Sequence, residues 1–251
     1  MPIKEVFPNP TVIQVIFQIT FPNLFFIEKT IGDFQKRIMD KFPESNLLFK
    51  KTFLFAHTSA DIKIDEMNAQ NNIETKVWQF KHQDKYTLNV LTNSIDISSN
   101  IHKTYNNEGG EKFRESNEYV INNFFEINAI PYLQRIGLRY IDHCPIPDGG
   151  DKEFMSYYKT SLPLNRFSLD NAISMDFQTV KNIGDNYFLT FAESIQYVLN
   201  KKKLVLNFDG FATNKLPNEY LSVTDKLHEI ISAEFENTIK EPVKCLMRKK
   251  Q

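Results

Sequence analysis

The segment Tyr132–Cys144 places the strongest constraint on the fold, because apolar and polar residues alternate along it. Side chains of a β-strand point to opposite faces with a period of two residues. Its apolar positions are Ile136, Leu138 and Tyr140. We therefore expect a central strand that packs this face against a hydrophobic core.

The opposite face of this strand carries Arg135, Gly137 and Arg139. A glycine between two arginines leaves room above the backbone, so the pattern predicts a cationic notch. The guanidinium group can hold a phosphate or a carboxylate through two parallel hydrogen bonds. An alternative is that both arginines pair with acidic residues of a covering helix, or lie along the sheet in solvent.

The rest of the chain alternates between strand and helix patterns. The expected strands are Val12–Phe21, Asn46–His57, Lys76–His82, Tyr86–Ser98, Ala172–Val180, Asn186–Glu193 and Lys203–Phe211. The expected helices are Ile31–Phe42, Glu111–Asn128, Asp151–Lys159 and Asn218–Ile239. A hairpin is expected around Gln83-Asp84-Lys85, and Arg248-Lys249-Lys250 is expected to be a solvated tail.

These elements predict an α+β fold with antiparallel sheet covered by helices. Residues 1–130 and 131–251 each read as strand, helix, three strands and helix, which indicates an internal duplication of a β-α-β-β-β-α unit. Short connections favour antiparallel pairing. We expect the two halves to form one continuous domain, with a curved sheet of about eight strands and a concave side.

Composition narrows the functional classes. The chain has 251 residues and a formal net charge of −1, so no global field attracts nucleic acid or an anionic membrane. The N-terminus lacks the pattern of a signal peptide, and no apolar run is long enough to span a membrane. The two cysteines, Cys144 and Cys245, lie far apart in the sequence. We expect a cytoplasmic protein with reduced thiols.

No catalytic or metal-binding motif is present in the sequence. The histidines lack the spacing of a metal site on a helix, and neither Gly-Gly pair belongs to a phosphate-binding fingerprint. Asp142-His143-Cys144 could suggest a thiol–base pair, but neighbouring strand residues point to opposite faces. We expect Cys144 to be a small buried residue. Lys50-Lys51 and Lys201-Lys202-Lys203 either protect strand edges or support binding of single-stranded nucleic acid.

The segment Gln134–Asp142, with its Arg-Ile-Gly-Leu-Arg-Tyr core, and an N-terminal strand ending in Phe21-Pro22 carry a resemblance. The chain resembles a sporadically distributed family of uncharacterised bacterial and archaeal proteins of similar length. The resemblance would cover nearly the whole chain, and it carries over no activity and no catalytic residue. Its patchy distribution implies horizontal transfer, as is common among defence and mobile-element genes.

The sequence therefore predicts a non-catalytic binding protein without metal or cofactor. Its ligand, an anionic molecule or a segment of a partner protein, would contact Arg135, Gly137, Arg139 and His143. A role as an accessory or sensor in prokaryotic antiviral defence would fit the resemblance. Three alternatives remain open: a binder of single-stranded nucleic acid, an enzyme that uses Asp142, His143 and the arginines, and a purely structural subunit.

Overall fold

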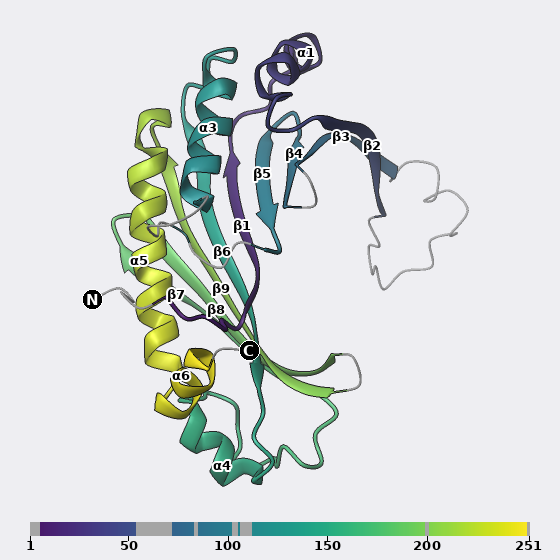
Figure 1. Cartoon of the computed structure of the whole chain (residues 1–251). Coiled ribbons are helices and arrows are strands. Elements are labelled where there is room, and N and C mark those ends of the chain that lie inside the picture. Colours follow the sequence, from purple (N-terminus) through teal and green to yellow (C-terminus); the bar gives the residue numbers. More distant parts are fainter. Residues whose placement is uncertain are drawn as a thin grey trace, which may run out of the picture.

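The fold of the described residues is a single antiparallel sheet with helices on one face. The computed structural model describes residues 6–53, 72–82, 85–101, 105, 112–198 and 201–249. Nine strands of this part of the chain form one sheet in the order β2-β3-β4-β5-β1-β6-β9-β8-β7 (Figure 1). The strands are β1 (Val12–Thr20), β2 (Glu44–Phe53), β3 (Asn72–His82), β4 (Tyr86–Val90), β5 (Ser94–Ser99), β6 (Leu133–Pro145), β7 (Met175–Gly184), β8 (Tyr187–Val198) and β9 (Lys201–Lys215). The predicted α+β class is confirmed.

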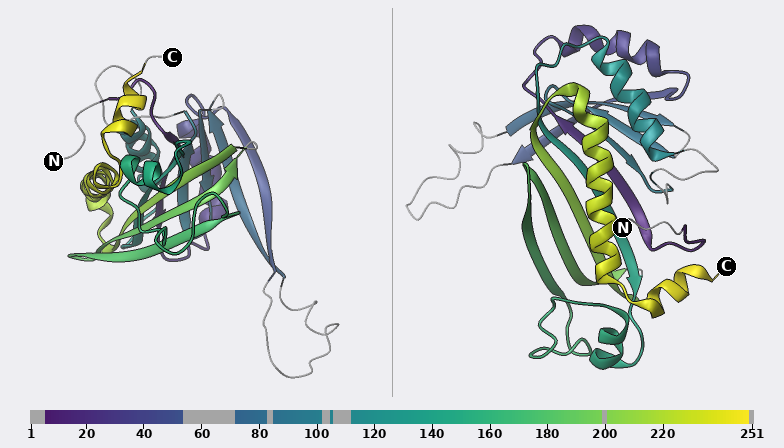
Figure 2. Two further views of the ribbon diagram at one scale, coloured as in Figure 1. Left: turned by 90° about the horizontal axis from the view of Figure 1, so that it is seen from below. Right: turned by 90° about the vertical axis from the view of Figure 1, so that its left-hand side faces the viewer.

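The helices lie together on one side of this sheet. They are α1 (Ile27–Ile38), α3 (Phe113–Phe125), α4 (Gly150–Tyr157), α5 (Tyr220–Thr238) and α6 (Glu241–Arg248), with a 3₁₀ turn η1 (Pro217–Glu219) before α5. Figure 2 (right) shows the yellow helix α5 in front of the strands, with the teal helix α3 beside its upper half and the purple helix α1 above them. The sheet therefore has one covered face and one face that these helices leave open.

Strand β6 lies at the centre of the sheet and pairs with β1 on one side and with β9 on the other. Ile136 and Leu138 are fully buried, and Tyr140 packs against the core from a partly buried position. The predicted core face of this strand is confirmed. Its other face must then point away from the helices, because the two faces alternate.

Helix α5 approaches the sheet closely at Gly210 of β9. A Cβ atom at this glycine would lie 3.2 Å from Cδ1 of Ile231 and 3.5 Å from Cδ2 of Leu227. Both of these side chains belong to α5 and are buried. The missing side chain at position 210 is what allows the helix to pack directly on the central strands.

A partly buried polar cluster joins α3 to α5. Arg114 of α3 binds the carboxylate of Asp225 with two hydrogen bonds of 2.8 and 3.0 Å, and the hydroxyl of Tyr105 donates to the same carboxylate. His228 stacks on Tyr105 at 4.5 Å and lies 3.3 Å from the hydroxyl of Tyr140. Burial lowers the pKa of His228 to about 4, so its ring is neutral at neutral pH.

The structure divides the expected strand Tyr86–Ser98 into β4 and β5. The amide of Leu91 donates to the carbonyl of Ser94 over 2.8 Å and closes a tight turn between them. The first half of the chain therefore has four strands between its helices, and the second half has three. The two halves differ in element order, and the internal duplication stays a prediction.

The C-terminal segment also differs from expectation. Pro242 lies beyond α5 and occupies the first turn of a further helix, α6, which the sequence pattern did not predict; a missing amide hydrogen has no cost at this position. Arg248 belongs to this helix, so the predicted tail is shorter. Residues 54–57 of the expected strand Asn46–His57, the turn residues 83–84, residue 111 and residue 250 lie outside the described residues. No helix in the described part of the chain is both long and apolar enough to cross a membrane.

We predict that Gly210→Val lowers the free energy of unfolding by about 1–3 kcal/mol, because the new methyl groups would collide with Ile231 of α5. Urea unfolding followed by circular dichroism measures this change. Gly32→Val is the matched control, since a Cβ at Gly32 meets no atom within 4 Å. Equal stability of the two variants would contradict the close approach of α5.

Candidate functional site

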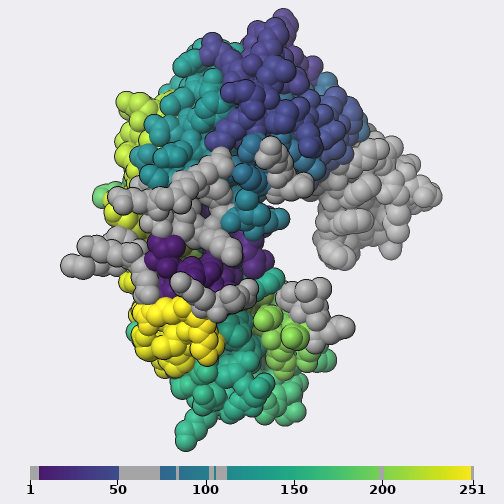
Figure 3. Space-filling view, in the orientation of Figure 1, coloured from purple at the N-terminus to yellow at the C-terminus, as the bar shows by residue number. Residues whose placement is uncertain are grey.

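We call the side of the sheet that faces away from the helices the open face. On the two central strands it comprises Arg135, Gly137, Arg139 and His143 of β6 and Asn207, Asp209 and Phe211 of β9. The space-filling view shows the right-hand side of the molecule hollowed, with residues of the first half of the chain above and of the second half below (Figure 3). The predicted site residues therefore share one face of the sheet.

Arg135 is held in place by three neighbours on adjacent strands. Its Nη1 donates to Oε1 of Gln18 over 3.1 Å, and its Nη2 donates to Oδ1 of Asp209 over 2.6 Å. Its guanidinium also lies 5.0 Å from the ring centre of Phe211, which is within range for a cation–π contact. This side chain has little freedom to bind another anion while these contacts remain.

The expected empty notch above Gly137 is filled by the guanidinium of Arg135. A Cβ atom at Gly137 would lie only 2.2 Å from Nη1 of Arg135. The prediction of open space at this position is therefore wrong. The physical reason is that Arg135 folds over the glycine to reach β1 and β9 at once, instead of standing beside it.

Arg139 differs from Arg135 in its contacts. Its Nε donates to Oδ1 of Asn207 over 2.8 Å. Among the residues that the structure describes, its Nη1 and Nη2 atoms have no hydrogen-bond or ion-pair partner. Asp209 lies directly opposite Arg139 on the neighbouring strand β9, but its carboxylate binds Arg135. Arg135 is thus paired with an acidic residue of a strand, whereas the alternative prediction placed such a residue on a helix. Arg139 keeps Nη1 and Nη2 without partners among the described residues.

A row of polar side chains crosses five strands of the open face at matching register. Its members are Asn46 of β2, Gln79 of β3, Asn89 of β4, Asp96 of β5 and Gln18 of β1. We call this set the polar row. Gln79 donates to Asn89 over 3.0 Å, and Asn89 donates to Asp96 over 2.8 Å. Gln18 accepts a hydrogen bond from Arg135, which in turn binds Asp209 of β9. Polar side chains therefore extend from β3 to β9, and only the step between Asp96 and Gln18 lacks a hydrogen bond.

The carboxylate of Asp96 shows how sheltered this row is. Burial raises the pKa of Asp96, while the hydrogen bond from Asn89 and the charge of Lys50 act in the opposite direction. The amides of the row therefore lie in a partly desolvated surface. Hydrogen bonds offered to a ligand there would discriminate more strongly than bonds on a fully solvated surface.

His143 lies on the open face but away from the arginines. It is four residues from Arg139 along β6, a separation of about 13 Å for an extended strand. Burial and the nearby charge of Lys203 both lower the pKa of His143. The structure therefore groups His143 with Lys203 near the end of β6, and it does not bring this histidine to Arg139.

Asp142 and Cys144 point to the covered face of the sheet. Cys144 is fully buried, as predicted. The hydroxyl of Thr11 donates to Asp142 over 2.8 Å, and burial raises the pKa of Asp142 to about 7. An enzyme site that joins Asp142 to the arginines is not formed, because these residues lie on opposite faces of β6. Within the described ranges, no group of three His, Cys, Asp or Glu residues is arranged to hold a metal ion.

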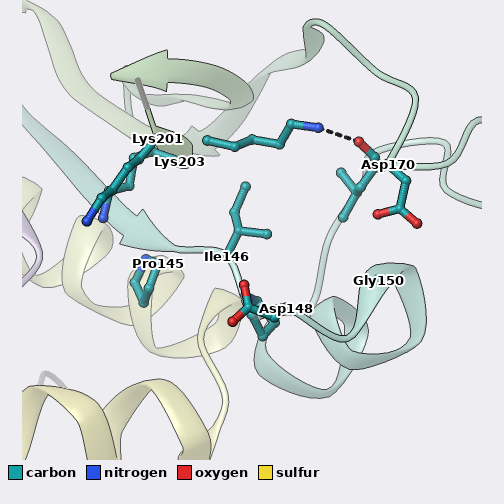
Figure 4. A pocket seen from close by; sticks show the side chains of 10 residues that line it. Pro145, Ile146, Asp148, Gly150, Asp170, Lys201 and Lys203 are labelled. Carbon is teal, nitrogen blue, oxygen red and sulfur yellow. Dashed lines mark hydrogen bonds between the residues drawn. The ribbon is translucent and has the colours of Figure 1, made fainter. Parts of the chain in front are cut away.

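A pocket of about 520 Å³ lies beyond the end of β6, next to the start of β9. Its charged lining residues are Asp148, Asp170, Lys201, Lys202 and Lys203. Figure 4 shows the ammonium groups of Lys201 and Lys203 on one side, while Asp148 and Asp170 lie across the pocket. Lys202 donates to the backbone carbonyl of Leu169. The opposite charges nearly balance, so this pocket has no strong preference for anions.

The partners that hold the arginines were not among the residues predicted from the sequence. Asn207 and Asp209 alternate with buried residues along β9, and Gln18 lies on the polar face of β1. Period-two polarity in these strands was the available signal. This signal does not identify the partners, because the residue pattern of a single strand does not determine which strands lie next to it in the sheet.

The comparisons with known proteins match this chain to no described family, no curated protein and no solved structure.

We predict that Asp142→Asn stabilises the protein at alkaline pH. The folded pKa of about 7 exceeds the usual 3.8, so the stability that Asp142 contributes is present in acid and is lost as the pH rises through 7. Asparagine keeps a neutral group beside Thr11, so the variant should gain on the order of 2 kcal/mol over the native protein at about pH 8.

Thermal unfolding at about pH 5 and about pH 8 measures this difference, which should shrink at the lower value. Asp176→Asn, at an exposed site on β7, is the control for the same substitution at an exposed carboxyl group. An equal effect of Asp142→Asn at both values would contradict a buried, largely protonated carboxyl group.

Proposed function

We propose that the protein binds an anionic ligand on the open face of its sheet, without catalysing a reaction, and that Arg139 makes the principal contact. The ligand carries a carboxylate or a phosphate group, either on a small molecule or on a segment of a partner protein. The observation that carries this proposal is the pair of free Nη donors of Arg139 on a sheltered polar surface.

The hydrogen bond from Nε of Arg139 to Asn207 supports this role. It fixes the plane of the guanidinium, so less side-chain entropy is lost when a ligand binds. The two Nη atoms then offer donors in a fixed geometry that suits the paired oxygens of a carboxylate or phosphate. Arg135 lies on the same face of β6, and its ion pair with Asp209 keeps the carboxylate of Asp209 from pairing with Arg139.

The charges around Arg139 favour a ligand with few charges. Arg135 and Asp209 form an ion pair of 2.6 Å and largely cancel, which leaves Arg139 as the net positive charge at this point. The polar row begins on the neighbouring strand β1, where Gln18 accepts a hydrogen bond from Arg135, and it continues across the open face to β2. A ligand with one acidic group and a polar body therefore fits better than a highly charged one. A role in prokaryotic defence rests on the sequence resemblance alone, and the open face adds no argument for it.

We predict that Arg139→Ala removes ligands that co-purify with the protein. Small molecules and peptides released by denaturing the purified protein are identified by mass spectrometry, and the identified ligand is then titrated by calorimetry. Loss of the charged contact should cost about 1.5–3 kcal/mol, which is a weakening of at least about tenfold. Asn207→Ala should have a smaller effect in the same direction, because it only frees the orientation of Arg139.

Arg166→Ala is the matched control for this experiment. Arg166 is exposed and lies over the ring of Phe167, and neither residue belongs to a strand of the sheet. It should retain the same ligands with unchanged affinity. Retention of every ligand by Arg139→Ala, with the fold intact by circular dichroism, would refute the proposed site.

A second candidate is binding of single-stranded nucleic acid. Phe188 and Phe211 stack on the open face with ring centres 5.1 Å apart and planes at 16°, and Arg135 lies against Phe211. Both rings are partly exposed. Aromatic side chains on a sheet, together with arginines, are the usual platform on which unpaired bases stack.

This candidate predicts that Phe188→Ala weakens binding of a fluorescent single-stranded RNA or DNA by about 1–3 kcal/mol. Binding should also fall steeply between about 50 and 300 mM salt. Phe25→Ala is the control, since Phe25 is 90% exposed and lies just before α1. Absence of binding, or binding that is independent of salt, would exclude nucleic acid and leave the anionic ligand.

A further inference from the structure

Within the described residues, strand β2 forms one edge of the sheet, and its outward backbone groups have no neighbouring strand. The sheet order ends with β2 on one side and β7 on the other. All ten residues of β2 pair with β3 in unbroken register, without a bulge. Edge strands are normally shortened, bulged or covered, because their free amides and carbonyls recruit other strands. In the described part of the chain, β2 is not shortened, bulged or covered, and Lys50 and Lys51 towards its end are the charged residues that could protect this edge.

The side chains of β2 are also unusually apolar for an exposed edge. Leu47, Leu48 and Phe49 are 50%, 43% and 53% exposed. They form a continuous run in the middle of the strand, and they project to both faces of the sheet because neighbouring residues alternate. A straight, apolar and exposed edge of this kind favours pairing with a further strand.

We propose that β2 pairs with β2 of a second copy of this chain, so that two sheets join edge to edge across a two-fold axis. The axis is perpendicular to the sheet, because this rotation makes the two β2 strands antiparallel and leaves the open faces of both copies on the same side. Residues that lie opposite each other must then both be even-numbered or both be odd-numbered. A symmetric register centred on Leu47 satisfies this requirement and places Leu47 against its own copy.

Charge complementarity selects this register. Glu44 and Lys50 lie three residues on either side of Leu47, and both are exposed on the open face. In the dimer each Glu44 lies opposite Lys50 of the other copy, which gives two equivalent cross-strand ion pairs. A register centred on Leu48 would place Lys50 opposite Asn46 and lose both pairs. Neither Glu44 nor Lys50 forms an ion pair within 4 Å with another residue of the described chain.

The other edge of the sheet fits a second strand less well. Strand β7 has a register shift between Asn182 and Gly184, and Lys181 on this strand is bonded to Glu234 of α5. Pairing of β2 with β7 would also be head-to-tail, and it would extend into open filaments instead of closing. The self-pairing of β2 gives a closed dimer that uses up the exposed edge.

Charge reversal tests the pairing and its register. Sedimentation equilibrium across a wide concentration range should show a monomer–dimer equilibrium for the native protein. Glu44→Lys and Lys50→Glu should each weaken dimerisation by about tenfold or more, because two attractive pairs become repulsive. The double variant Glu44→Lys/Lys50→Glu should restore the native affinity. Asp176→Lys, on the open face of the edge strand β7, is the matched control and should not change it.

Mixing the two single variants gives an independent readout. A Glu44→Lys copy and a Lys50→Glu copy are complementary at both pairs, so native mass spectrometry should show the mixed dimer in preference to either homodimer. Lys81 lies opposite Glu44 on β3, so thermal unfolding of every variant checks that the fold is retained. A native protein that stays monomeric, one that forms open-ended oligomers, or single variants that dimerise as well as the native chain would each overturn the proposal.

Discussion

The hydrogen-bonded pairing of β6 with β1 and β9 is the interaction on which the rest of the structure depends. It is the only connection within the described sheet between β1–β5 and β7–β9. The same pairing fixes which side chains of β6 face the helices and which face outward. A slip of one residue would expose Ile136 and Leu138 and would bury Arg135, so the core and the site are specified together.

The two arginines of β6 have different roles because their neighbours differ. Arg135 is bound to Gln18 and Asp209 and stabilises the junction of three strands. Arg139 meets a neutral amide, which orients the guanidinium without neutralising it. The partly buried Arg135–Asp209 pair engages both of its charges with each other, whereas Arg139 has no acidic partner among the described residues. This difference makes Arg139 the better candidate for a contact residue.

The alternation of apolar residues predicted most strands, the covered face of β6 and the buried state of Cys144. The turn between β4 and β5 was missed because Leu91 and Ile95 continue the apolar pattern on both sides of a short polar segment. Helix α6 was missed because Pro242 can either follow a helix or begin one. The partners of Arg135 and Arg139 needed the strand order, which depends on tertiary packing. The filled notch followed from those partners, so it could not be foreseen either.

Gly137 and Arg135 occupy one shared volume above β6. Because a Cβ atom at position 137 would lie 2.2 Å from Nη1 of Arg135, a side chain there requires the flexible end of Arg135 to move. A relative with alanine or serine at the first position must carry a shorter residue at the second, or must turn its arginine away from β1 and β9. We therefore expect positions 135 and 137 to co-vary among related sequences that keep this surface.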